Sequence, residues 1–279
     1  MPPTFAFDQP GVRIRLDELP TDPPKGTSRK EAEARLAELG EELFELQDLL
    51  WGARLHSLLV VLQGRDTAGK DGVIKTVAGY LNPRGVHVVS FGPPTQEELE
   101  HDFLWRVHRH TPRKGEVAIW NRSHYEDVLV VRVHGLTPAS IWRERYGHIC
   151  DFEELLAEHD TIVRKFFLHI SHREQQARLL ERERDPRKAW KLSVGDWRER
   201  EHWDAYTEAY EEAISRCATP RAPWIVVPAD AKWYRNLVVA EALVEALRPY
   251  RPVWEAHLDA LGHKARAELA AYRAAARTS

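Results

Sequence analysis

The feature that most constrains the fold of this chain is the glycine-rich segment 64–72, GRDTAGKDG, which directly follows the apolar run HSLLVVLQ. Such a run is typical of a buried strand. Gly64, four further residues, Gly69 and Lys70 match the P-loop pattern, in which backbone amides and a lysine hold phosphate oxygens. Asp71 stands where that pattern has the Ser or Thr that ligates magnesium. A strand, a glycine-rich turn and a helix in this order predict an anion site. Asp71 in place of the hydroxyl predicts that the chemistry of this site is unusual.

Strand and helix patterns alternate along the rest of the chain. Besides the first strand, short apolar runs predict strands at 86–91, 117–120, 163–170 and 224–227. Helical patterns cover 28–51, 69–81, 95–108, 139–158 and, with a break near Asp185-Pro186, 171–216. This alternation predicts a parallel five-stranded sheet with right-handed crossovers and helices on both faces.

The two ends of the chain differ from this core in composition. Residues 1–27 hold six prolines, so we expect an extended segment that is no domain of its own. Residues 28–252 form the predicted domain. Residues 253–279 are rich in alanine and predict one further helix, for packing or oligomer formation and not for a membrane.

Composition excludes several classes of protein. The formal net charge is −3, so an anion site must come from local clustering, and we expect no nucleic-acid partner. Cys150 and Cys217 are far apart and outside any metal-ligand or redox spacing, so we expect both to be inert. No leader and no long apolar stretch stand out, so we expect a cytoplasmic protein without membrane contact.

Asp66 lies inside the loop, where a carboxylate repels phosphate unless a metal ion or a transferred proton compensates it. An Asx-turn that shapes the loop is the alternative. Asp71 has two open roles, a metal ligand through water or a cap of the following helix. The strand at 117–120 runs into NRSHYED, residues 121–127, which we expect to face the loop because ligands bind at the carboxyl ends of parallel strands. Arg122 can then bridge phosphate oxygens, with an exposed helix cap as the alternative.

Together, GRDTAGKDG, NRSHYED and the later DPRKAWKLS resemble the family-2 polyphosphate kinases, from about residue 28 to about residue 250. The resemblance implies a P-loop kinase-like three-layer α/β fold with a mobile helical lid at about 173–200. It also implies magnesium, with Mn²⁺ as a substitute, and reversible phosphoryl transfer between inorganic polyphosphate and nucleotides. Asn121 departs from the Asp of many members. Glu126, where many ADP-using members have Asn, resembles the class III subgroup, which phosphorylates AMP to ADP and ADP to ATP.

The lid segment 173–191 carries seven bases against four acids, which favours a polyanion such as polyphosphate. Arg178 and Arg182, four residues apart, share a helical face, although a solvated helix with internal ion pairs has the same pattern. The expected catalytic residues are Asp66, Lys70 and Arg122, those for metal are Asp66 and Glu126, and those for nucleotide specificity are Asn121 and Glu126. The expected phosphate-binding residues are Gly64, Ala68, Gly69, Lys70, Asp71, Gly72, Lys75, Arg122, Arg132, Arg178, Arg182, Lys188 and Lys191.

The expected partners are inorganic polyphosphate, AMP, ADP and ATP, and a second copy of the chain in a homo-oligomer. Two other functions are compatible with the residues. One is an ATP-dependent nucleoside or nucleotide kinase of the same fold, and the other is a non-catalytic polyphosphate-binding module. Use of ATP in place of polyphosphate as the phosphoryl donor would identify the first. Tight polyphosphate binding without turnover of any nucleotide would identify the second.

Overall fold

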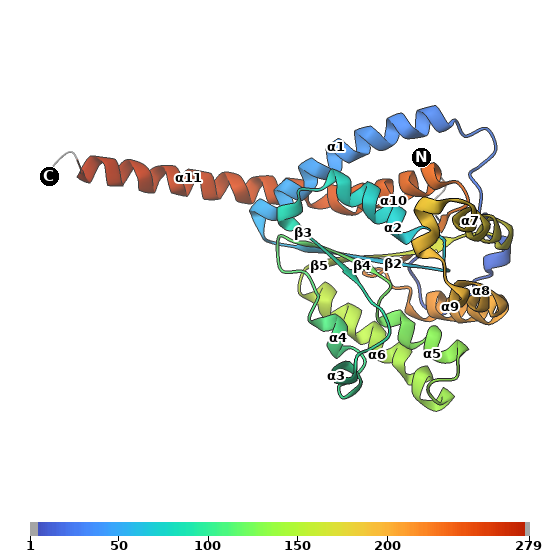
Figure 1. Ribbon diagram of the computed structural model, residues 1–279. Coiled ribbons are helices and arrows are strands. Elements are labelled where there is room, and N and C mark those ends of the chain that lie inside the picture. The colour runs from blue at the N-terminus through green and yellow to red at the C-terminus, as the bar shows by residue number, and fades with distance from the viewer. Residues whose placement is uncertain (1–4, 277–279) are drawn as a thin grey trace.

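The computed structural model describes residues 5–276, apart from the side chains of Lys188, Ala189 and Lys191. A six-stranded sheet in the order β1-β6-β5-β2-β4-β3 lies between two layers of helices (Figure 1). The strands are β1 (Phe5–Phe7), β2 (Ser57–Gly64), β3 (Val86–Ser90), β4 (Val117–Asn121), β5 (Thr161–His169) and β6 (Trp224–Pro228). The five strands from β2 to β6 are parallel, which confirms the fold class expected from the alternation of patterns.

The prediction of five strands was wrong by one. β1, from the proline-rich N-terminal segment, pairs antiparallel with β6, with Phe5 opposite Val226. Without β1, the outer side of β6 would leave unpaired backbone groups at the edge of the sheet. Three residues with intermediate and exposed side chains carry too little pattern for a strand to be read from the sequence.

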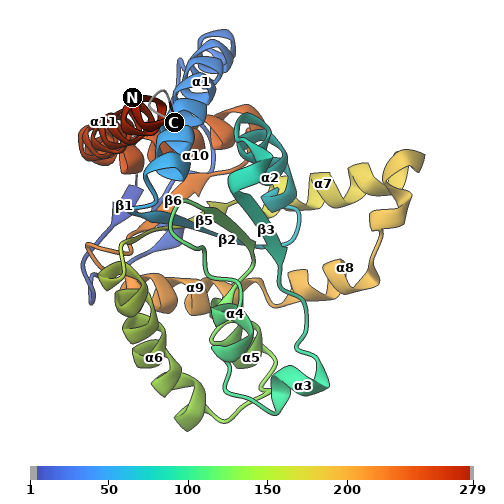
Figure 2. The same ribbon diagram turned by 90° about the vertical axis from the view of Figure 1, so that its left-hand side faces the viewer.

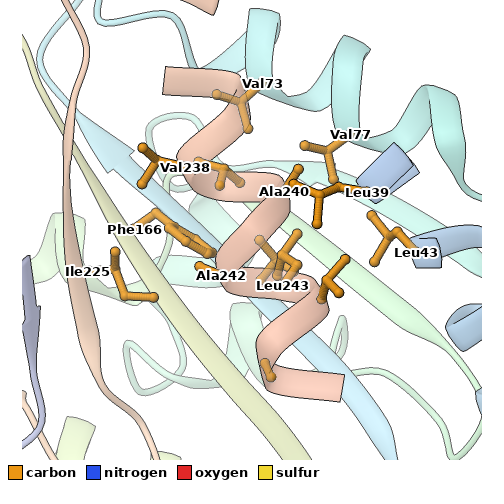
Figure 3. Packing of buried hydrophobic residues seen from close by; sticks show 14 of the residues in the cluster. Leu39, Leu43, Val73, Val77, Phe166, Ile225, Val238, Ala240, Ala242 and Leu243 are labelled. Atoms are coloured by element: carbon orange, nitrogen blue, oxygen red, sulfur yellow. The ribbon is translucent and has the colours of Figure 1, made fainter. Parts of the chain in front are cut away.

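Apolar residues fill both faces of the sheet. Along β2, Leu58, Val60 and Leu62 point into one core and Leu59 and Val61 into the other, as a central parallel strand requires. The first core packs under α1 (Arg29–Ala53), α2 (Lys70–Val77) and α10 (Lys232–Leu247), whose Leu, Val and Ala side chains meet above Phe166 and Ile225 (Figure 3). The other layer holds α4 (Trp105–His108), α5 (Val130–Val133), α6 (Ala139–Glu158) and α9 (Trp203–Cys217) (Figure 1).

The single helix predicted over 95–108 is instead two short ones, α3 (Gln96–Leu99) and α4. Asp102 explains the break, because its Oδ1 accepts hydrogen bonds from the backbone N–H groups of Leu104 and Trp105. An aspartate that accepts such bonds starts a new helix and does not continue the old one.

Two parts of the chain extend from this body. α7 (His172–Arg184), the 3-10 helix Pro186–Lys191 and α8 (Val194–Glu201) form a hairpin that projects beyond the sheet (Figure 2). α11 (Arg251–Ala275) buries Trp254 near its start and then runs away from the domain (Figure 1). Over residues 5–276, none of the helices has the length and apolar character needed to cross a bilayer.

The sheet order determines where a ligand can reach the loop. β2 lies between β4 and β5, so the chain leaves β2 in one direction for β3 and later returns to its other side. Such a reversal opens a crevice at the carboxyl ends of the strands. Both the glycine-rich loop after β2 and the NRSHYED turn after β4 lie at this edge.

Candidate functional site

The loop 64–69 connects β2 to α2 and surrounds the Lys70 ammonium. Gly69 is the N-cap of α2 with a φ of 101°, a left-handed conformation that favours glycine, and a Cβ there would collide with the Arg235 guanidinium unless that side chain moved. Lys70 Nζ donates to the carbonyl oxygens of Gly64 at 2.6 Å and Arg65 at 3.4 Å. Burial lowers the pKa of Lys70, and the nearby Arg122 lowers it further. The loop therefore holds a buried cation that gains from a bound anion.

Arg122 links the two predicted motifs. Its guanidinium donates to Asp66 Oδ1 at 2.8 Å and to Glu126 Oε2 at 3.1 Å, which joins the loop after β2 to the turn after β4. Burial lowers the pKa of Arg122, but Glu126 and Asp66 outweigh it and the net shift is upward. Arg122 also has a φ of 64°, a left-handed conformation that is uncommon outside glycine and concentrates at functional sites. The structure thus confirms that NRSHYED faces the loop.

Asp71 does not cap α2, so that alternative was wrong. The N-cap is Gly69, and Asp71 lies inside the first turn, where its Oδ1 accepts a hydrogen bond of 2.9 Å from the Asn121 side-chain amide. Asn121 Oδ1 is buried and has no hydrogen-bond partner among the described residues. An acceptor without a donor beside a carboxylate suits a cation or its bound water.

The acidic groups at this edge are too few for an all-protein metal cage. Within residues 5–276, no group of three or more His, Cys, Asp or Glu side chains could hold a metal. Magnesium is normally held by one or two carboxylates together with waters and substrate phosphates. Asp66 and Glu126, with the unpartnered oxygen of Asn121, therefore fit Mg²⁺ that arrives with a phosphate substrate.

A cavity of about 620 Å³ opens beside Asp66, Arg122 and Glu126. The segment after β3, Phe91, Gly92, Pro93 and Pro94, lines it together with Leu99 and Leu136. Trp203, Tyr206 and Tyr210 of α9 line another side. A largely apolar cavity that also exposes charged groups suits a ligand with both an apolar and an anionic part, such as a nucleotide.

A buried network supports the NRSHYED turn from below. Lys165 of β5 donates to Glu153 Oε2 at 2.5 Å and to the Tyr125 hydroxyl at 2.9 Å, and that hydroxyl donates to Glu153 at 2.9 Å. His124 lies 3.2 Å from the same carboxylate. Burial lowers the pKa of His124 and keeps the ring neutral, while Lys165 balances the Glu153 charge. These contacts hold the residues next to Arg122 and Glu126 in place.

The expectation that Arg178 presents its charge to a run of phosphates is corrected by its contacts. Arg178 is 6% exposed, and its guanidinium donates to the carbonyl oxygens of Thr67, Ala68, Ala229 and Asp230 and to the Glu174 carboxylate. The first turns of α7 pack against the loop, so this arginine holds the loop in place. Arg182 lies further out and braces α7 against α8 through Asp196 at 2.7 Å.

Of the four other predicted cations, one is exposed, one is ion-paired and two have side chains that are not described. Lys75 is exposed on α2. Arg132 pairs with Glu212 at 2.6 Å and lines a second cavity of about 920 Å³ beside α9, which Arg65 of the loop also lines. The side chains of Lys188 and Lys191 lie outside the described part of the chain.

The sequence analysis missed Arg235, which lies beneath the loop. It is 2% exposed on α10 and donates to the Ala68 carbonyl at 3.1 Å, the same oxygen that Arg178 reaches. Burial lowers the pKa of Arg235 to about 10, and the Arg178 charge contributes to the shift. The only signal in the sequence was one arginine among several polar residues of a mostly apolar helix, which a pattern search reads as a solvent-facing position.

Comparison with known proteins identifies the family. The family model of polyphosphate kinase 2 (PPK2) matches residues 26–252. An AMP/ADP-polyphosphate phosphotransferase of Meiothermus ruber is 52% identical over 242 residues, which cover 86% of this chain and 90% of the relative. An ADP-polyphosphate phosphotransferase of Rhodopseudomonas palustris is 40% identical over 250 residues, which cover 85% of this chain and 86% of the relative. The crystal structure of polyphosphate kinase 2 from Arthrobacter aurescens is 40% identical and matches with a TM-score of 0.82, over 87% of this chain and 90% of that one. With loop, turn and fold in agreement, the chain belongs to the polyphosphate kinase 2 family.

Proposed function

We propose that this enzyme transfers the terminal phosphoryl group of inorganic polyphosphate to AMP and to ADP, giving ADP and ATP, in a reversible reaction. The observation that carries the proposal is the position of Arg122, between Asp66 and Glu126, where the loop meets the cavity. The 52% identical relative is named for both acceptors, AMP and ADP, which supports the same pair here.

Lys70 and the loop amides hold the reacting phosphates in this mechanism. Lys70 is 8% exposed, and its ammonium donates hydrogen bonds to two neutral carbonyl oxygens and not to a carboxylate. Phosphate oxygens supply a balancing charge and are oriented by the N-terminus of α2. Holding donor and acceptor in line supplies most of the rate enhancement in phosphoryl transfer.

Arg122 stabilises the charge that develops on the transferred group. Before substrate binds, its guanidinium is neutralised by Asp66 and Glu126, and a phosphate competes with these two carboxylates for the same donors. A planar guanidinium matches phosphate oxygens with two parallel hydrogen bonds. No general base is required, because a nucleotide phosphate is already ionised near neutral pH.

Asp66 and Glu126 would hold magnesium, or Mn²⁺ in its place, with Asn121 Oδ1 available to a bound water. When bound, the metal neutralises phosphate oxygens and helps to orient them. The protein contributes the positions of these carboxylates, which Arg122 holds in place.

Glu126 is the proposed discriminator between AMP and ADP, because its carboxylate is 16% exposed and lines the cavity where a β-phosphate would end. Glu126→Asn should shift the ratio of kcat/KM values for AMP and ADP, measured with polyphosphate in excess. Glu268→Asn on the exposed part of α11 is the matched control and should leave the ratio unchanged. An unaltered ratio in Glu126→Asn refutes the assignment.

The decisive experiment incubates purified protein with polyphosphate, magnesium and AMP and separates the nucleotides by chromatography. ADP followed by ATP is the expected result, and Lys70→Ala should form neither. Turnover with ATP but not with polyphosphate as donor would show an ATP-dependent nucleotide kinase. Tight polyphosphate binding without turnover of any nucleotide would show a binding module.

A cytoplasmic location and a homo-oligomer remain part of the proposal. Outer residues of α11 support the second, since Leu261 and Leu269 are each 47% exposed and Tyr272 is 73% exposed on a helix that leaves the domain. Sedimentation of the full chain and of a Leu261→Glu variant tests this contact. Equal masses for the two would exclude α11 as the contact between copies.

A further inference from the structure

The two cysteines, far apart in the sequence, face each other between α6 and α9. Cys150 Sγ lies 3.6 Å from the carbonyl oxygen of Arg216, the residue before Cys217. Cys217 Sγ lies 3.8 Å from the carbonyl oxygen of Tyr146, one turn before Cys150. Each sulfur therefore reaches the backbone of the helix that carries the other, so two cysteines far apart in the sequence lie close in the fold.

The two thiols differ in exposure. Cys150 is partly exposed at the surface of α6, whereas Cys217 is 0% exposed in the core beneath α9. The neighbouring Cys217 lowers the pKa of Cys150, while Cys150 and burial raise the pKa of Cys217. An accessible sulfur that ionises more readily, beside a buried one that stays protonated, is the usual arrangement of an attacking and a resolving cysteine.

We propose that Cys150 and Cys217 are a redox pair that closes an intrachain disulfide when the protein meets a hydroperoxide. The Cys150 thiolate attacks the peroxide, takes one oxygen as sulfenic acid and releases hydroxide, or an alkoxide that takes a proton from water. The Cys217 sulfur then displaces that oxygen as water, forms the S–S bond and gives up its proton. Each thiol loses one electron, the peroxide gains two, and a dithiol reductant reverses the reaction.

The disulfide would join two helices that belong to the active-site surroundings. The Cys217 carbonyl accepts a hydrogen bond from Lys165, which also binds Glu153 and Tyr125 of the network under the NRSHYED turn. α9 also supplies Trp203, Tyr206 and Tyr210 to the cavity wall. Linking the end of α9 to α6 removes freedom from the unfolded chain and stabilises the fold, provided that the native helices accommodate the bond.

The experiment treats the freshly reduced full-length protein with hydrogen peroxide and follows free thiols with a maleimide reagent, intact mass and thermal melting. The expected result is loss of both thiols together, a mass lower by two hydrogens, one peptide linking positions 150 and 217 after digestion, and a higher Tm, all reversed by dithiothreitol. Thiols that persist, or disulfides formed only between chains, would overturn the proposal. A linked peptide with a lowered Tm would equally overturn it, because the native fold would then not accommodate the bond.

Two single variants separate the roles of the sulfurs. Cys217→Ala should trap the sulfenic acid at Cys150, visible as a dimedone adduct, and Cys150→Ser should leave Cys217 unmodified at the same peroxide concentration. Equal dimedone labelling of Cys217 in Cys150→Ser would refute the assignment of Cys150 as the attacking residue. Cys150→Ser is the safer variant, because its side chain lies at the surface of the helix.

Discussion

Replacing Lys165 with methionine tests the buried network under the NRSHYED turn. Lys165 is 0% exposed and Glu153 is 1% exposed, so the variant leaves a carboxylate in the core without its ammonium. Removing one partner of a buried ion pair costs about 3–5 kcal/mol, against about 5–15 kcal/mol for the stability of a whole domain. Glu153 keeps its contacts with Tyr125 and His124, so we expect a loss near the lower limit, about 3 kcal/mol.

The assay is urea unfolding followed by tryptophan fluorescence, supported by thermal melting. A loss of this size should lower the Tm by about 6–12 °C for a domain of more than 150 residues. Lys114→Met is the matched control, because Lys114 binds Asp160 at 2.7 Å in an ion pair whose side chains are 51% and 48% exposed. An exposed pair contributes about 0–1 kcal/mol, so this control should change the free energy of unfolding little.

The pH dependence of the loss gives a second check. Burial raises the pKa of Glu153 in the wild type, but Lys165 and His124 outweigh it, so the folded pKa is lowered. A lowered folded pKa means that the ionised Glu153 contributes to the free energy of unfolding. This contribution is present above the unfolded pKa, about 4.3, and is lost as pH falls through the folded pKa. Without Lys165, burial raises the folded pKa of Glu153, so the penalty is full at neutral pH and disappears in acid.

The difference between wild type and Lys165→Met should therefore be largest near pH 7 and shrink as pH falls toward 4. The double variant Lys165→Met with Glu153→Gln should recover part of the loss, because neither charge then remains in the core. A loss below about 1 kcal/mol at pH 7, or one that grows as pH falls, would refute this account of the network.

Three further predictions concern the loop and its substrate. Lys70→Ala should lower kcat by about 10²–10³ in a coupled ADP assay while its melting temperature stays within a few degrees of wild type, and equal activity would remove the assignment of the loop. Gly69→Ala should lower the free energy of unfolding, measured in urea, by about 1–2 kcal/mol because of the left-handed backbone there, and by more if Arg235 must also move. Gly79→Ala is the control and should change it little, because a Cβ at that position meets open space. The apparent affinity for polyphosphate should fall with salt, with a log–log slope of about −0.7 for each phosphate neutralised, and a flat response would exclude binding through charge.

Local patterns predicted most of the fold. The expected helix at 139–158 coincides with α6, and the strands β2 to β6 differ from prediction by at most about two residues, the usual uncertainty of element ends. These strands are buried on both faces and therefore leave continuous apolar runs in the sequence. β1 left no such run, and the Asp102 cap divided a helix that periodicity alone would have continued.

The candidate site was predicted in part. Asp66, Lys70, Arg122 and Glu126 were expected at one edge of the sheet because parallel strands place their carboxyl ends together, and the structure brings Arg122 within 2.8 Å of Asp66. The contacts of the Arg178 side chain were not predictable from the sequence. Helical spacing tells which residues share a face of the helix, but not which part of the protein or of a ligand packs against that face. Arg235 was not found because it lies far along the chain, in a helix whose other polar residues make one more charge unremarkable.

The sequence by itself determined the strand, loop and helix around GRDTAGKDG and the polar end of the strand before NRSHYED, because backbone conformation there depends on neighbouring residues. Only the tertiary structure decided that Arg178 and Arg235 meet the same carbonyl oxygen, that Asp66 and Glu126 share Arg122, and that Cys150 faces Cys217. These contacts join segments from different helices and loops, and the packing of the layers against the sheet sets which side chains lie within hydrogen-bonding distance.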